Sequence, residues 1–297
     1  MSAVDLAPAK INVCLLLGPI READGRHELC SVMQALELAD RLTLADAPVG
    51  ASADEVVCPG VTGENLAARA LAAFRAATGW DGPPQRLEII KEVPVAGGMA
   101  GGSADAAAAL RLVRDRAAAD AEGLAAPSDD ELRELAATLG ADVPAQVRPG
   151  RWLATGAGER VAPLAAPAPY GVLVLPGDGP LRTPDVFREA DRLGLPRDAD
   201  GLAAGIAEVT AAALAGPLAA AACVNELAPA ARSLRPSIDV ALEQALACGA
   251  DVAMVSGSGP TVLGLFADAA GAERAAAELA PHRPALATRP RSGMLAR

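Results

Sequence analysis

The sequence predicts an α+β protein of two domains, and three observations support this class. Apolar segments with strand character, such as residues 7–16 and Val172 to Leu175, alternate with long alanine- and leucine-rich segments of helical character. Near the C-terminus, two apolar runs flank the glycine turn Ser256 to Pro260, as in two paired strands. Such groups of strands and helices are typical of layered α+β domains. A proline- and alanine-rich stretch near residue 165 is the expected boundary, which gives domains at residues 1–165 and 166–297.

In the N-terminal half, two further strand segments and one helix are expected after residue 16. The segment Leu29 to Leu44 is predicted to be one strand, or two strands separated at Asp40 and Arg41. Residues 63–78 are predicted to be helical, because the apolar side chains repeat on one face. Leu87 to Val93 is the strand expected to lead into a glycine-rich segment, Pro94 to Asp105.

Two more helices follow the glycine-rich segment. The first is the alanine-rich run that Ser103 opens. The second begins at Ser128, which forms a capping box with Glu131, and ends at Gly140. The C-terminal half is then predicted to contain helices near 185–193, 203–214, 224–234, 236–248 and 269–279, and a last strand near 284–288.

Composition limits the classes of function. The five cysteines are odd in number and widely spaced, which favours free thiols in a reducing compartment over disulfides or a zinc site. No signal peptide and no run of about 20 apolar residues are recognised, so we expect a cytoplasmic protein without a membrane partner. The net charge of −11 argues against nucleic acid but permits a small phosphorylated ligand. No metal ligands are predicted.

The glycine-rich segment is the main candidate for a binding site. Glycines followed by a serine and a helix expose backbone N–H groups at the positive end of the helix dipole, which favours phosphate. The alternative is a flexible surface loop. Neither common nucleotide motif fits: no lysine follows a glycine as in a P-loop, and no frame of the segment matches GxGxxG. Only two of the 26 basic residues are lysines, Lys10 and Lys91, which suggests sites that need a compact ammonium unless both occur there by chance.

The sequence resembles the GHMP kinase superfamily in three separated motifs. These are APAKIN around Lys10, PVAGGMAGGSAD at residues 94–105 and MVSGSGPTVLGLF at residues 254–266. The finer resemblance is to the 4-diphosphocytidyl-2-C-methyl-D-erythritol kinases, through PAKIN, DGRHEL, the glycine segment and LGADVP, in this order over nearly the whole chain. This resemblance implies a two-domain GHMP fold, with an N-terminal domain of the ribosomal-protein-S5 domain 2 type and a C-terminal ferredoxin-like α/β layer.

The resemblance also implies roles for individual residues. Lys10 and Asp142 would be catalytic: Asp142 as the base for the acceptor hydroxyl, and Lys10 orienting Asp142 and offsetting charge on the γ-phosphate. The cofactors would be ATP and Mg²⁺. The residues implied near the adenine are Asn65, Leu66 and Lys91, and those around the ATP phosphates are Pro94, Val95, Ala96, Gly97, Gly98, Met99, Ala100, Gly101, Gly102, Ser103 and Ala104.

The implied substrate is a cytidine diphosphate-linked methylerythritol, with Asn12, Arg26, His27 and Phe187 as the binding residues. This chain departs from the family at Arg26, where the family has a tyrosine that stacks on the cytosine. A guanidinium can stack on a base or reach a phosphate. A second departure is Ala104, which stands where many members have a serine.

Three functions stay open from the sequence. The first is the cytidyl-methylerythritol kinase. The second is another GHMP kinase, acting on homoserine or a mevalonate derivative, and the third is a non-catalytic nucleotide-binding homologue. The DGRHEL block argues against the second, and the presence of both Lys10 and Asp142 argues against the third. The sequence does not decide between a monomer and a homodimer.

Overall fold

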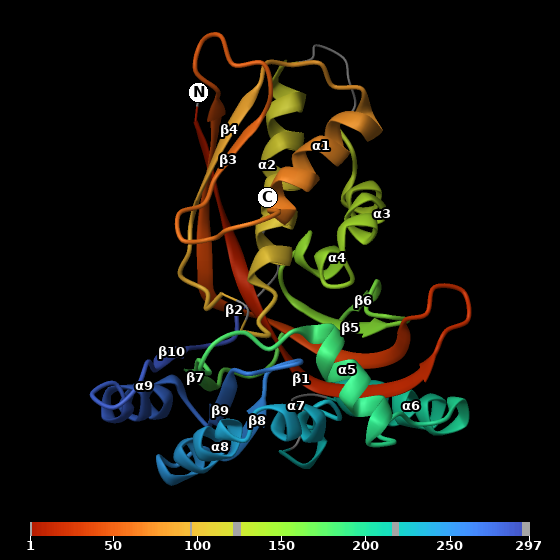
Figure 1. Ribbon diagram of the computed structural model, residues 1–297, viewed down its shortest axis with the longest axis vertical. Helices are drawn as coiled ribbons and strands as arrows, with labels where there is room; N and C mark the ends of the chain where they lie inside the picture. Colours follow the sequence, from red (N-terminus) through yellow and green to blue (C-terminus); the bar gives the residue numbers. More distant parts are fainter. Residues whose placement is uncertain (1, 96, 121–125, 216–219, 293–297) are drawn as a thin grey trace. The chain divides into compact units, whose positions relative to one another are not determined.

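The computed structural model describes residues 2–95, 97–120, 126–215 and 220–292 of the 297 residues (Figure 1). The chain divides into two compact units built from interleaved segments. The first comprises Met1–Ala9, Leu38–Val95 and Ala100–Pro149, and the second comprises Lys10–Glu37, Ala96–Met99 and Gly150–Arg297. The long strands β1 (Ala3–Ile20) and β2 (His27–Asp46) each contribute residues to both units. The domain boundary near residue 165 stays a prediction.

In the first unit, helices cover one side of a group of strands (Figure 1). Strand β4 (Gln85–Ile90) pairs in parallel with β3 (Glu55–Val57) and antiparallel with the C-terminal part of β2. The helices are α1 (Leu66–Thr78), α2 (Gly101–Asp120), α3 (Asp129–Leu139) and α4 (Val143–Gln146). Helices α1 and α2 pack closely, and the buried alanines of α2 at 104 and 106–109 contribute to the core of this unit.

Local signals explain the ends of these helices. The capping box of Ser128 and Glu131 is confirmed, and the N–H of Gly140 bonds to the carbonyl of Ala136 at the end of α3. Helix α1 begins at Leu66 and not at residue 63, because the side chain of Asn65 caps it by accepting a bond from the N–H of Ala67 at 2.9 Å.

Of the two alternatives for Leu29 to Leu44, the single strand is confirmed and the break at Asp40 and Arg41 is wrong. Strand β2 runs without interruption through Asp40 and Arg41. Asp40 is fully buried, and its carboxylate accepts hydrogen bonds from the backbone N–H groups of Glu92 and Val93. These partners satisfy a charged residue inside a strand, where the sequence pattern alone indicates a turn.

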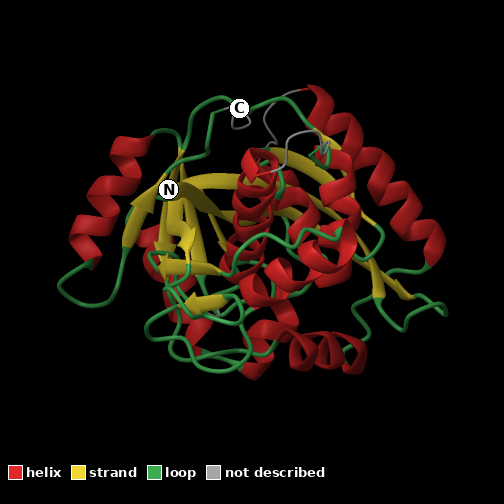
Figure 2. Ribbon diagram, turned by 90° about the horizontal axis from the view of Figure 1, so that it is seen from above, coloured by secondary structure: helices red, strands yellow, loops and turns green. Residues whose placement is uncertain are grey.

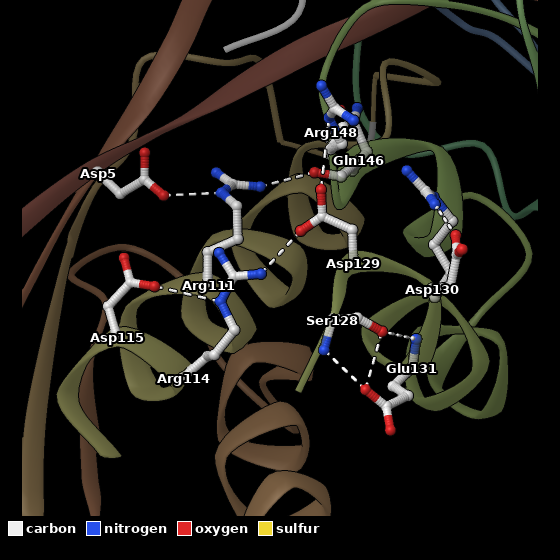
Figure 3. A network of polar contacts seen from close by, with 11 residues as sticks. Asp5, Arg111, Arg114, Asp115, Ser128, Asp129, Asp130, Glu131, Gln146 and Arg148 are labelled. Atoms are coloured by element: carbon white, nitrogen blue, oxygen red, sulfur yellow. Dashed lines mark hydrogen bonds and ion pairs between the residues drawn. The ribbon is translucent and has the colours of Figure 1, made fainter. Parts of the chain in front are cut away.

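A buried arginine joins α2 to α4 (Figure 3). Arg111 is 2% exposed, and its guanidinium donates to the carboxylate of Asp5, to the carbonyl of Leu6 and to the carbonyl of Gln146 in α4. Nearby, Arg114 pairs with Asp129 at the start of α3. One charge-assisted bond therefore ties α2 to α4, the short helix that follows Asp142.

The second unit contains a four-stranded antiparallel sheet in the order β10–β7–β9–β8. Its strands are β7 (Gly171–Leu175), β8 (Val252–Val255), β9 (Val262–Phe266) and β10 (Leu286–Thr288). Helices α8 (Ser237–Ala247) and α9 (Ala269–Leu279) pack against it. The predicted strand pair around the glycine turn at 256–260 is confirmed. Figure 2 shows the helices and strands of both units by colour.

The second unit also contains the N-terminal part of β2, two more strands and further helices. Strands β5 (Arg151–Thr155) and β6 (Arg160–Pro163) pair with each other, and β5 pairs with residues 31–34 of β2. The remaining helices are α5 (Thr183–Arg192), α6 (Ala199–Ala215), the 3-10 turn η1 (Ala220–Ala222) and α7 (Ala228–Leu234).

Helix α7 begins later than the predicted residue 224, because Val224 and Glu226 form backbone hydrogen bonds with Leu15 of β1. Along the residues that the structure describes, no helix is both long and apolar enough to cross a membrane.

Candidate active site

The two glycine motifs of the sequence contact each other in the second unit. The hydroxyl of Ser256 donates to the carbonyl of Gly98 at 3.0 Å. Gly98 has a φ of +73°, and a Cβ there would lie 2.2 Å from the carbonyl oxygen of Ser256. Only glycine satisfies both the backbone conformation and this close approach. The turn after β8 therefore holds the centre of the glycine-rich segment in place.

The side chain of Asn225 also binds the backbone of this turn, and the sequence did not predict this role. Its side-chain amide donates to the carbonyls of Val255 and Gly257, at 2.8 and 2.7 Å, and its oxygen accepts from the N–H of Leu227. All three bonds go to the backbone, so the side chain defines the path of the chain at residues 255–257. Val255 and Gly257 lie 30 and 32 residues after Asn225 in the sequence, so no local motif predicts these two contacts.

In the first unit, the glycine-rich segment leads into helix α2. The helix begins at Gly101, so Ser103 lies in its first turn and does not cap it as predicted. Gly102 is exposed, and a Cβ there would meet no atom within 4 Å. The first N–H groups of a helix have no partner within the helix and attract anions. An exposed glycine in the first turn of a helix is chemically suited to an anion such as phosphate.

A buried charge cluster lies beside this helix start. The ammonium of Lys91, just after β4, donates to Asp40 of β2 and, at 2.7 Å, to Asp105 of α2. Burial by itself lowers the pKa of Lys91, but the two carboxylates outweigh burial and leave that pKa raised. One oxygen of Asp105 is buried without a hydrogen-bond partner. Lys91 therefore ties three elements of the first unit together around the start of α2.

Asp105 gives the protein a testable pH dependence. Burial raises its pKa from 3.8 to about 7, against the opposing effect of Lys91. Between these values the folded protein keeps a proton that the unfolded chain releases, so this carboxyl lowers the free energy of unfolding as pH rises from about 4 to 7. Asparagine has the shape of the protonated acid without this dependence. Relative to wild type, Asp105→Asn should gain stability by up to about 1.4 kcal/mol for each unit of pH in that interval.

Urea unfolding at pH 5, 6, 7 and 8 measures this gain for Asp105→Asn. The control is Asp115→Asn, the same change at an exposed position of α2. A difference between Asp105→Asn and wild type that stays constant from pH 5 to 8 would contradict the prediction.

Lys10 lies in the second unit within a chain of buried polar groups. Its ammonium donates to the side-chain oxygen of Asn12 at 2.7 Å, and the amide of Asn12 donates to the hydroxyl of Ser31 at 2.6 Å. The backbone N–H of Lys10 also donates to the carbonyl of Met99 in the glycine-rich segment. Two predicted site residues, Lys10 and Asn12, are thus in direct contact, and Lys10 adjoins the glycine-rich segment through its backbone.

Asp142 lies in the first unit, immediately before α4. It occupies the N-cap position of this short helix, but its side chain forms no capping hydrogen bond there. The carboxylate is half-buried. An aspartate in such a turn is usually a cap or a turn former, and the structure shows no capping bond from Asp142 to α4.

Of the residues predicted to bind the substrate base, His27 and Phe187 contact each other in the second unit. Nδ1 of His27 donates to the carbonyl of Gly18 at 2.8 Å, and Nε2 lies 3.1 Å from the carboxylate of Asp191. The ring of Phe187 lies 5.3 Å from that of His27. Arg26 is exposed and has no ion pair among the described residues, whereas the neighbouring Arg21 pairs with two carboxylates. Asp191 was not predicted, since its link to His27 spans 164 residues.

Comparison with known proteins identifies the family. A model of the GHMP kinase N-terminal domain matches residues 65–150, and a model of the GHMP kinase C-terminal domain matches residues 205–283. A 4-diphosphocytidyl-2-C-methyl-D-erythritol kinase of Salinispora tropica is 44% identical over 282 residues, which cover 92% of this chain and 86% of that protein. The chain belongs to the 4-diphosphocytidyl-2-C-methyl-D-erythritol kinase family. The kinase of the same description from Streptomyces coelicolor is 43% identical, with 91% and 89% covered.

Solved structures agree with this family. A crystal structure of 4-(cytidine 5'-diphospho)-2C-methyl-D-erythritol kinase is 31% identical, covers 98% of this chain and all of that chain, and gives a TM-score of 0.76. A homoserine kinase from Cytophaga hutchinsonii, at 17% identity, covers 98% of this chain and 94% of its own, with a TM-score of 0.72, and shows the shared fold alone. The predicted two-domain GHMP kinase fold is confirmed.

The structure divides the predicted site residues of this family member between the two units. Asn12, Arg26, His27, Phe187, Lys10 and the centre of the glycine-rich segment belong to the second unit, and Asp142, Lys91 and the start of α2 belong to the first. Asn65 is the cap of α1 and Leu66 its first residue, so the predicted adenine contact falls at a helix start. Ala96 lies outside the described residues. The binding and catalytic roles of all these residues stay predictions.

Proposed function

We propose that this protein uses ATP to phosphorylate the 2-hydroxyl of 4-diphosphocytidyl-2-C-methyl-D-erythritol, in the non-mevalonate pathway of isoprenoid biosynthesis. The observation that carries this proposal is the 44% identity, over 92% of the chain, with a kinase described by that substrate. The free state of the five cysteines supports the reducing conditions of the cytoplasm as its location.

In the proposed reaction the protein positions the two substrates and supplies charged groups around the phosphoryl group that is transferred. The carboxylate of Asp142 accepts the proton of the acceptor hydroxyl, and the ammonium of Lys10 neutralises charge on the travelling phosphoryl group. The contact of Lys10 with Asn12 supports this role, since a bond of 2.7 Å to an amide oxygen restricts the direction of the ammonium.

The glycine-rich segment and the start of α2 would hold the phosphates of ATP. Their backbone N–H groups donate to anionic oxygens, and the exposed Gly102 lets a phosphate approach closely. When bound, Mg²⁺ would supply charge neutralisation for the phosphates of ATP. Among the described residues, no group of three or more histidine, cysteine or acidic side chains could hold a metal ion.

Release of ADP from MgATP, with and without candidate alcohols, tests the function. We expect turnover with the cytidyl diphosphate substrate and a phosphorylated product detectable by mass spectrometry. Turnover only with homoserine or a mevalonate derivative would replace this function by that of another GHMP kinase. Binding of ATP without turnover on any of these alcohols would indicate a nucleotide-binding protein that is not a kinase.

Arg26 allows a prediction about substrate binding. Its exposed guanidinium, with no ion pair among the described residues, lies next in sequence to His27, whose ring contacts Phe187. If Arg26 serves as a stacking group, Arg26→Tyr should keep the KM for the cytidyl substrate unchanged or lower it by up to about fivefold. Steady-state kinetics at saturating ATP measure this. An increase in KM of tenfold or more (about 1.4 kcal/mol) would mean instead that the positive charge of Arg26 matters, as expected for a contact with the diphosphate.

A further inference from the structure

The hydrogen bonds between Lys10 and Ser31 have a fixed direction. Ser31 is fully buried on β2, and its hydroxyl donates its one proton to the carbonyl of Cys14 at 2.7 Å. A carbonyl only accepts, so this proton is committed. Towards Asn12, 2.6 Å away, the hydroxyl of Ser31 can therefore only accept.

This direction determines how the amide of Asn12 lies. An amide has a donating and an accepting end. With its NH₂ group towards Ser31, Asn12 presents its oxygen to the ammonium of Lys10, at 2.7 Å. The reverse orientation would place two donors against each other at Lys10 and two acceptors against each other at Ser31. Asn12 is 2% exposed, so water cannot readily replace either partner.

We propose that Ser31 is a positioning residue for phosphoryl transfer: its hydroxyl fixes the amide of Asn12, and through it the ammonium of Lys10. This inference rests on the proposed function for its kinetic consequence, but the orientation itself follows from the three buried hydrogen bonds alone. Without the hydroxyl, the NH₂ group of Asn12 loses its buried acceptor, and the amide no longer favours the orientation that attracts Lys10.

Kinetics of two substitutions test the proposal. Ser31→Ala should lower kcat about tenfold to a hundredfold through misplacement of Lys10, while the KM for the cytidyl substrate changes less than about threefold. Ser31→Thr keeps the hydroxyl and should restore kcat to within about threefold of wild type. The matched control is Cys30→Ala, which also removes one buried polarisable atom from β2 but on the opposite face of the strand. It should keep the wild-type kcat.

A wild-type kcat in Ser31→Ala, or a kcat in Ser31→Thr as low as in Ser31→Ala, would overturn the proposal. Equal losses in Ser31→Ala and Cys30→Ala would do the same, since they would indicate a general effect on the strand. If Ser31→Ala does not fold, Ser31→Cys replaces the hydroxyl by a much weaker acceptor of similar shape, and its kcat is then expected to show the same loss.

A spectroscopic measurement separates this proposal from the proposed function. In the folded wild-type protein, the side-chain amide protons of Asn12, assigned by their loss in Asn12→Asp, should exchange slowly with solvent. In Ser31→Ala they should exchange at least about tenfold faster and shift. Unchanged exchange would overturn the orientation argument whichever substrate the enzyme uses, whereas a wild-type protein inactive on the cytidyl substrate but with this NMR behaviour would overturn the proposed function alone.

Discussion

Replacement of Asp142 by asparagine is expected to lower kcat about a thousandfold and to leave the Kd for ATP within about twofold of wild type. Asparagine has almost the shape of aspartate but cannot accept the proton of the acceptor hydroxyl at neutral pH. The aspartate side chain forms no capping bond to α4, so the substitution removes no capping bond from that helix. Isothermal titration with ATP and single-turnover kinetics with the cytidyl substrate measure the two quantities separately.

The control for this substitution is Asp130→Asn, the same chemical change at a strongly exposed position of α3. It should leave both kcat and the Kd unchanged. A large loss of ATP binding in Asp142→Asn would show that this carboxylate belongs to the nucleotide site or to the fold. A kcat close to wild type would remove Asp142 from the role of base, and the proposed mechanism with it.

The predictions about elements succeeded where the signal is local. Ser128, Glu131 and Gly140 act within one or two turns of each other, so the start and end of α3 could be predicted from spacing alone. The break in β2, one of the two alternatives for this segment, was wrong for the opposite reason. Asp40 is satisfied by Lys91 and by two backbone N–H groups more than 50 residues away, and a charged pair of residues without known partners indicates a turn.

The same limit applies to the candidate site. The motifs around Lys10 and the glycine-rich segment could be recognised because each is a continuous stretch of sequence. Ser31, Asn225 and Asp191 could not, because each acts through contacts with residues distant in sequence and none belongs to a motif that the sequence displays. Such residues determine the direction of the recognised ones, so a sequence identifies the chemical groups of this site more readily than their orientation.

Gly98→Ala is expected to lower kcat/KM for ATP about a hundredfold, because the glycine-rich segment would have to move. A Cβ at this position would lie 2.2 Å from the backbone oxygen of Ser256, and a backbone oxygen held within a turn cannot rotate away as a side chain would. The positive φ of +73° adds strain for any residue with a Cβ. The shift would also stretch the bond from the hydroxyl of Ser256 to the carbonyl of Gly98.

The conformational strain and the steric clash at Gly98 can be separated with Gly79→Ala. Gly79 ends α1 with a φ of +68°, but a Cβ there would meet no atom within 4 Å. Both substitutions therefore carry the strain of a left-handed alanine, about 1 kcal/mol of stability, and only Gly98→Ala carries the clash. Equilibrium unfolding should show a loss in both variants, and ATP kinetics a loss in Gly98→Ala alone. Normal ATP kinetics in a folded Gly98→Ala protein would mean that the contact between the two glycine motifs does not shape the phosphate site.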